Sequence, residues 1–212
     1  MIYILGSKNN FPNILSRYFT KDGITNQLVS NFANVTPADI IIIFHDPSLD
    51  DELEMNVNEL AKKCDQIFYF LPYNDDKNEH KNHYSGNNVA VIKYPDIIGT
   101  GCSVIFEKVF ERKSNFIQWP GESFLKHEFI FALDFCKYLG NLVVNNASEN
   151  LDIKIYTIEQ IAAAINELTG IMVKISKSAN ILKRNPDLEN KEISNATELY
   201  QGLADIFNGL EN

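Results

Sequence analysis

Few residues in this chain have the types and spacing that catalysis or metal binding requires. Cys64, Cys102 and Cys136 are far apart and form no CxxC pair, and the four histidines have no metal-ligand spacing. We therefore predict buried, reduced thiols and no metal site. One spacing could support proton transfer, because the stretch YNDDK places Tyr73 four residues before Lys77. A polar loop or the start of a helix is the alternative interpretation of that stretch.

The chain begins with MIYILGSKNNFPNIL, in which a short apolar run is followed at once by Gly6. A strand, a glycine-rich loop and a helix N-terminus can together bind a phosphate group. A complete loop of this kind would carry two further glycines, and this chain has Asn9 and Pro12 instead. Asn9 tolerates a left-handed backbone, but Pro12 lacks an N–H group and adds bulk. These residues favour an ordinary strand-to-helix turn over an intact dinucleotide loop.

Alternating strands and helices must position these residues. The spacing of apolar residues over 11–20 and the charge pattern over 50–63 predict two helices. Because strands and helices alternate, we predict an α/β fold with a doubly wound, mostly parallel sheet. In such a sheet, ligands bind at the carboxyl ends of the strands. The predicted strands span residues 2–5, 24–29, 38–44, 66–71 and 88–94.

The second half of the chain has a different pattern, which predicts a smaller α/β portion. Thr157 and Gln160 have the spacing of a capping box in front of an apolar-periodic stretch. Gly170 stands where that helix should end. The other predicted elements are helices over 103–112 and 195–210, a strand over 171–176 and a strand-to-helix change near Asp134.

Charge and hydropathy exclude several classes of function. The chain of 212 residues has a formal net charge of −9, which disfavours a surface that follows nucleic-acid phosphates. No apolar run approaches the roughly 18 residues that a membrane span needs, and no signal-peptide pattern begins the chain. We therefore expect a cytoplasmic protein that binds neither nucleic acid nor membrane.

The order of these motifs resembles the extended short-chain dehydrogenase/reductase family, the NAD-dependent nucleotide-sugar epimerases and dehydratases. YILGSKNNFPN is similar to the family's strand–TGxxGxxG–helix, with Gly6 at the first glycine. ADIIIIFHDP resembles the family's strand that is followed by His-x-Ala-Ala, and His45 stands after it. VAVIKYPDIIGTG is similar to V-x-x-L-R-x-x-N-x-Y-G-P-G, and HEFIFALD resembles R-D-F-I-Y-V-D-D.

The resemblance implies a Rossmann-like core over residues 1–102 and a small C-terminal α/β substrate-binding portion over residues 103–212. It also implies two groups of site residues, which are Gly6, Ser7, Asn9 and His45 for the cofactor and Lys93, Asp96, Gly99, His127 and Asp134 for the substrate. The catalytic candidates, Tyr73 and Lys77, come from their spacing of four residues.

Two of the substrate-binding candidates, Lys93 and His127, stand where the family has arginine, so either could face a nucleotide diphosphate. Asp134 matches an aspartate of the family, and capping a helix is its alternative role. Trp119 lies in FIQWPGES, where it could stack on a base or pack in a loop.

The chain also departs from the family at the residues of proton transfer. Leu71-Pro72 stands where the family's strand ends in a catalytic Ser or Thr. Tyr73 follows this strand directly, whereas the family's Tyr–Lys pair lies in a later helix. The chain is also shorter than family members usually are.

These departures predict a degenerate epimerase/dehydratase-like protein of nucleotide-sugar or surface-polysaccharide metabolism. Its role would be that of a binding or partner protein without the usual hydride chemistry. The expected partners are a nucleotide-sugar ligand and an oligomer with its own or a related subunit, and we expect no bound cofactor. An active NAD(P)-dependent enzyme with atypical residues is one alternative, and a purely structural interaction protein is another.

Overall fold

In the computed structural model, the chain forms two compact units. Unit 1 comprises Met1–Pro95 and Tyr138–Glu149, and unit 2 comprises Asp96–Lys137 and Asn150–Asn212. The residues that the structure describes are 1–6, 11–30, 35, 40–45, 57–73, 87–99, 102, 116–120, 124–145, 150–176 and 188–208.

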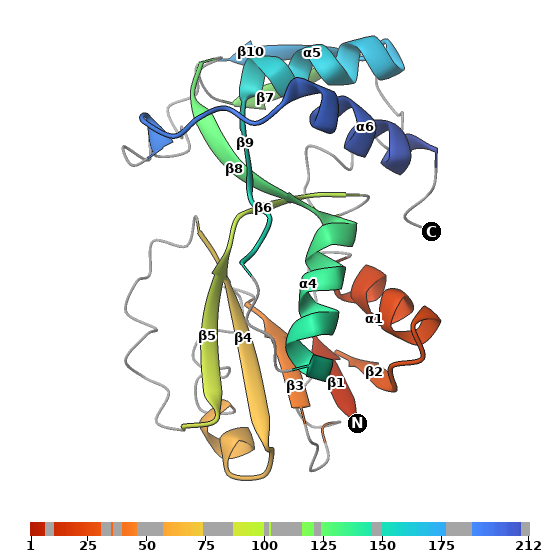
Figure 1. Ribbon diagram of the computed structural model, residues 1–212, viewed down its shortest axis with the longest axis vertical. Coiled ribbons are helices and arrows are strands. Elements are labelled where there is room, and N and C mark those ends of the chain that lie inside the picture. Colours follow the sequence, from red (N-terminus) through yellow and green to blue (C-terminus); the bar gives the residue numbers. More distant parts are fainter. Residues whose placement is uncertain are drawn as a thin grey trace. The chain divides into compact units, whose positions relative to one another are not determined.

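Unit 1 is built around a five-stranded sheet in which every described strand pairing is parallel, in the order β2-β1-β3-β4-β5 (Figure 1). The predicted parallel sheet is therefore confirmed, and the carboxyl ends of its strands share one edge. Because the chain adds β2 on one side of β1 and β3 on the other, the point between β1 and β3 is the topological switch point. The strands are β1 (Ile2–Leu5), β2 (Asn26–Val29), β3 (Ile40–Phe44), β4 (Gln66–Pro72) and β5 (Val89–Tyr94).

Both faces of this sheet are apolar, as a central parallel strand such as IIIIF in β3 requires. The second half of α4 (Ala132–Asn145) belongs to unit 1 and lies beside α1 (Phe11–Lys21) (Figure 1). A Cβ at Gly140 of α4 would lie 3.9 Å from the rings of Tyr18 and Phe19. On the other face, the helical turn at 57–61 joins the core cluster of the sheet. Helix α1 (Phe11–Lys21) buries Phe11, Pro12, Leu15 and Phe19.

Unit 2 contains a three-stranded sheet in the order β6-β8-β9 and a parallel pair, β7 and β10. In the three-stranded sheet, β6 runs parallel to β8, and β9 runs antiparallel to it. Side chains of β6, β8 and β9 form one apolar cluster with those of α5 and α6. The elements are β6 (Asp96–Ile98), β7 (Phe116–Pro120), β8 (Lys126–Phe131), β9 (Lys154–Thr157), α5 (Ile158–Thr169), β10 (Met172–Ser176) and α6 (Ala196–Phe207).

The capping signals of α5 are confirmed. The Thr157 hydroxyl accepts a hydrogen bond from the Gln160 backbone N–H at 3.2 Å, and the Gln160 side chain accepts one from the Thr157 N–H at 2.9 Å. Gly170 follows the helix with φ of 72°, the left-handed conformation that ends many helices. The strand over 171–176, the final helix and the strand-to-helix change in front of Asp134 are confirmed as well.

Three short strands, β6, β7 and β9, were not predicted. Asp96 follows β5, as predicted, and is also the first residue of β6. Trp119, for which a loop was one of two interpretations, lies in β7. β6 has three residues, which are too few for a periodic signal. The helix predicted over 103–112 and the start of the helix over 50–63 lie outside the described residues. None of the helices that the structure describes is long and apolar enough to cross a membrane.

Candidate functional site

In unit 1, Gly6 and His45 flank the switch point, because Gly6 follows β1 and His45 follows β3. A Cβ at Gly6 would lie 2.8 Å from Cγ of Pro12, which is closer than packed carbon atoms approach, and 3.2 Å from Cβ of Phe44, which is tighter than most such contacts. Gly6 has no positive φ value, since the described glycines with positive φ are Gly23 and Gly170. A side chain at Gly6 is therefore excluded by the pyrrolidine ring of Pro12 and not by the backbone conformation.

Aromatic rings fill the α1 side of this edge. Phe11 of α1 meets Phe44 edge-on, with ring centroids 5.3 Å apart, and Phe44 stacks on Phe70 at 5.3 Å. Tyr94 meets Phe44 and Phe70 at 6.2 Å and 6.4 Å. All four rings are buried. The ends of β3, β4 and β5 are thus joined to α1 by ring packing.

His45 lies at the same edge but on the opposite face of the sheet, where two contacts hold it. Its backbone N–H donates to the Phe70 carbonyl at 2.9 Å, and its Nδ1 atom lies 2.6 Å from the Tyr69 hydroxyl. Both side chains are buried. Sequence reasoning missed Tyr69, although the register of β3 and β4 places it diagonally opposite His45. The two groups can share a proton, with donor and acceptor set by the histidine tautomer.

Of the two catalytic candidates, Tyr73 lies at the same edge of the sheet. The Tyr73 backbone N–H donates to the Tyr94 carbonyl at 2.8 Å, so Tyr73 continues the pairing of β4 with β5 and its side chain is 37% exposed. Lys93 lies in β5 opposite Leu71. The structure thus brings Gly6, His45, Tyr73 and Lys93 to one edge of the sheet of unit 1. Lys77, Ser7 and Asn9 lie outside the described residues.

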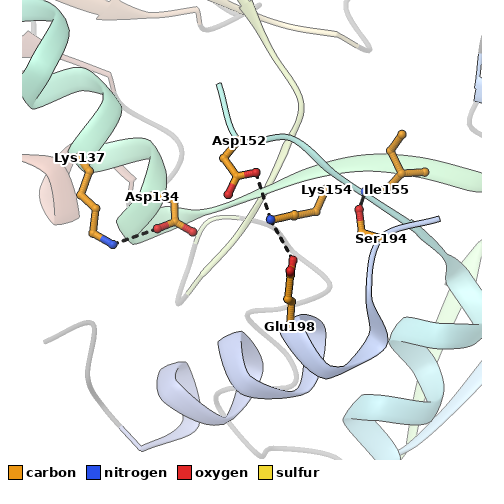
Figure 2. Close-up of polar contacts among 7 residues, drawn as sticks. All are labelled: Asp134, Lys137, Asp152, Lys154, Ile155, Ser194 and Glu198. Atoms are coloured by element: carbon orange, nitrogen blue, oxygen red, sulfur yellow. Dashed lines mark hydrogen bonds and ion pairs between the residues drawn. The ribbon is translucent and has the colours of Figure 1, made fainter. Parts of the chain in front are cut away.

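In unit 2, Asp96 and His127 project from the same face of the three-stranded sheet. Asp96 pairs with Phe129, which lies two residues after His127 on β8, and residues two apart share a face. Gly99 follows β6 directly. Asp134 lies in the first turn of α4, where the helix dipole favours a carboxylate, and it accepts a hydrogen bond from Lys137 at 3.0 Å (Figure 2).

The face of the sheet that carries His127 also carries an ion cluster that sequence reasoning missed. Lys154 of β9 contacts Asp152 at 3.0 Å and Glu198 of α6 at 2.9 Å (Figure 2). Burial lowers the pKa of His127, so its imidazole is neutral near pH 7. Within the described ranges, no group of three or more His, Cys, Asp or Glu side chains is arranged to hold a metal ion.

Comparison with known proteins gives one partial sequence match. No protein-family model matches the chain. A segment of 96 residues is 33% identical to the tungsten-containing aldehyde ferredoxin oxidoreductase cofactor-modifying protein of Pyrococcus furiosus. The match covers 44% of this chain and 26% of that protein, so it covers only a small part of that relative.

Solved structures share the fold at low sequence identity. L-threonine dehydrogenase from Phytophthora infestans gives a TM-score of 0.66 at 14% identity over 99% of this chain and 98% of its own. TunA, an NAD-dependent NDP-hexosamine 5,6-dehydratase involved in tunicamycin biosynthesis, gives a TM-score of 0.65 at 9% identity. That match covers 98% of this chain and 97% of the TunA chain. CapF, a capsular polysaccharide assembling protein from Staphylococcus aureus, gives a TM-score of 0.58 at 14% identity. That match covers 79% of this chain and 55% of the CapF chain. The chain therefore has a Rossmann-like fold, which it shares with these solved structures.

Proposed function

We propose that this chain is a divergent, extended short-chain dehydrogenase/reductase-type protein that binds a nucleotide sugar without performing the usual hydride transfer. Its role in nucleotide-sugar or surface-polysaccharide metabolism is that of a binding or partner protein. The observation that carries this proposal is the packing of Pro12 against Gly6 at the switch point.

This packing bears directly on dinucleotide binding. A dinucleotide-binding loop uses one glycine so that the backbone can approach the pyrophosphate, and another so that the helix can pack closely on the strand. Here the ring of Pro12 already occupies the space beside Gly6, and Phe11 packs on Phe44. Pro12 also supplies no N–H group for a phosphate oxygen. This packing at the described residues supports the proposal that the edge does not hold the pyrophosphate of NAD(P).

The residues of proton transfer support the same conclusion. β4 ends in Leu71 and Pro72, neither of which has a side-chain hydroxyl to orient a substrate. The Tyr73 backbone N–H donates to the Tyr94 carbonyl and so continues the pairing of β4 with β5, whereas the Tyr–Lys pair of the family lies in a later helix. The likeness to solved structures that include TunA supports a sugar-nucleotide ligand, because TunA acts on an NDP-hexosamine.

One alternative is an active NAD(P)-dependent nucleotide-sugar epimerase, dehydratase or reductase with atypical residues. The buried His45–Tyr69 pair favours it, because these two groups can exchange a proton at the edge where a Rossmann-like sheet binds ligands. A purely structural interaction protein, with a related subunit as its partner, is the other alternative.

Calorimetry and thermal shift with a ligand panel separate these functions. The panel contains NAD(H), NADP(H) and UDP-, GDP- and dTDP-sugars. A ligand at 100 times its Kd stabilises the folded protein by about 2.7 kcal/mol, which a melting curve resolves. We expect a sugar nucleotide to raise the Tm and the dinucleotides to leave it unchanged.

Saturable NAD(P) binding at micromolar Kd would overturn the proposal and favour the enzyme. In that case Tyr73→Phe tests the Tyr–Lys pair, because loss of the phenol should abolish turnover if the pair transfers the proton. Unchanged turnover would exclude Tyr73 and leave His45 and Tyr69 as the proton-transfer candidates. If no member of the panel shifts the Tm, the interaction protein is favoured.

A further inference from the structure

Two buried polar atoms of unit 2 have no hydrogen-bond partner among the described residues, namely Nε2 of His127 and the hydroxyl of Tyr156. Tyr156 is fully buried, at 0% exposure. The two residues stand directly opposite each other in the antiparallel pairing of β8 and β9. Directly opposite residues project from the same face, with Cβ atoms roughly 4.5–5.5 Å apart. Both unpartnered atoms therefore belong to neighbouring side chains on one face of the sheet.

The charged groups near this pair come from α6, from β9 and from the segment just before β9. Lys154, two residues before Tyr156, shares its ammonium between the carboxylates of Asp152 and Glu198, so the trio carries a net charge of −1 (Figure 2). Burial is the main cause that raises the pKa of Tyr156 to about 12, and the Glu198 carboxylate is the next largest cause. Burial lowers the pKa of His127. Near pH 7 the pair is thus a protonated phenol and a neutral imidazole, with no positive charge to offer.

We propose that His127 and Tyr156 form a buried site for one neutral hydroxyl oxygen. Buried polar atoms without a partner are rare in folded proteins, and an oxygen that both donates and accepts can satisfy a phenol and an imidazole nitrogen together. Water and a sugar hydroxyl have this chemistry in common. The occupant is a water molecule in the ligand-free protein and a sugar hydroxyl in the complex, and the second assignment rests on the proposed function.

An anion does not suit this site. A phosphate would need a cation or several N–H donors, whereas His127 is neutral and the nearby ammonium of Lys154 is already shared by two carboxylates. His127 therefore contacts the sugar of a sugar nucleotide and not its diphosphate. This differs from the role that the family resemblance suggested for His127.

Tyr156→Phe tests the water site, because it removes only the hydroxyl oxygen and keeps the ring in the core. If the hydroxyl is satisfied by a bound water, the variant loses a hydrogen bond and its Tm falls by about 2–4 °C. The matched control is Tyr200→Phe, which removes a hydroxyl that donates to Glu167 at 2.7 Å on the exposed side of α6 and should move the Tm by less than about 2 °C. An unchanged or higher Tm for Tyr156→Phe overturns the site, since removal of an unsatisfied buried hydroxyl is neutral or stabilising.

NMR of the ¹⁵N-histidine-labelled chain tests the sugar assignment. Each UDP-, GDP- and dTDP-sugar is compared at saturation with UDP, GDP or dTDP alone. We expect the His127 ring nitrogens to shift with the sugar nucleotide and not with the diphosphate, and Tyr156→Phe to weaken sugar-nucleotide binding about 5-fold. A His127 shift with the diphosphate alone overturns the neutral site. If calorimetry detects binding while His127 does not move, the sugar assignment is wrong and the proposed function stands. If calorimetry detects no binding, the proposed function fails, and the Tyr156→Phe melting curve still decides the water site.

Discussion

The Nδ1 atom of His45 lies 2.6 Å from the hydroxyl oxygen of Tyr69, where β3 and β4 reach the carboxyl edge of the sheet in unit 1. The two residues are 24 positions apart in the chain, and only the parallel register of β3 and β4 brings them together. Because both side chains are buried, the hydrogen bond satisfies two polar groups that water does not reach.

Tyr69→Phe should therefore lower the free energy of unfolding by about 1–3 kcal/mol, because it leaves the imidazole nitrogen buried without the hydroxyl. Urea unfolding of the wild type, Tyr69→Phe, His45→Leu and the double variant gives the coupling energy of the pair. Additive effects of the two single changes would contradict a direct contribution of the hydrogen bond.

Gly6→Ala should destabilise unit 1 by about 1–3 kcal/mol, because the new Cβ would meet Pro12 and Phe44. Adding Pro12→Ala should recover part of this loss in chemical denaturation. Gly140→Ala is the matched control, since its Cβ would make ordinary contacts at 3.9 Å inside a helix and should stabilise by up to about 1 kcal/mol. A neutral Gly6→Ala would mean that Gly6 is not required by packing.

Gly202→Ala should destabilise unit 2 although alanine favours a helix, because a Cβ on α6 would overlap the ring of Phe131. We expect a loss of about 1–3 kcal/mol in urea unfolding. Phe131→Leu in the same chain shortens the side chain that the Cβ meets. The double variant should therefore lose less than the sum of the two single variants, and a larger loss would refute the contact as the cause.

Acid should destabilise the protein through His127. Burial lowers the pKa of this imidazole from its ordinary value of 6.5, so below pH 6.5 the unfolded chain binds a proton that the folded chain does not. The free energy of unfolding therefore falls as the pH drops from 6.5 toward the lower folded-state pKa, and this contribution is constant above that window. Urea unfolding at several pH values should give a steeper decline for the wild type than for His127→Gln. Parallel curves below pH 6.5 would contradict the burial of a neutral imidazole.

Local patterns were sufficient to predict much of the fold. The apolar run of β3 predicts a strand buried on both faces, and the capping box with Gly170 predicts both ends of α5. Each of these signals depends on side chains within one turn of a helix or one strand, so no distant residue is needed to interpret it. The alternation of such elements was enough to predict the parallel sheet and the shared edge at which its strands end.

What the sequence by itself determined is thus the order of the elements, the edge at which the strand ends gather and the departures at Pro12, Leu71 and Pro72. Only the tertiary structure decided that Pro12 fills the space beside Gly6, that Tyr69 meets His45 and that Tyr156 stands opposite His127. These pairs depend on strand register and helix docking between distant segments. A shift of one residue along a strand would turn each side chain to the other face, and no local pattern contains that information.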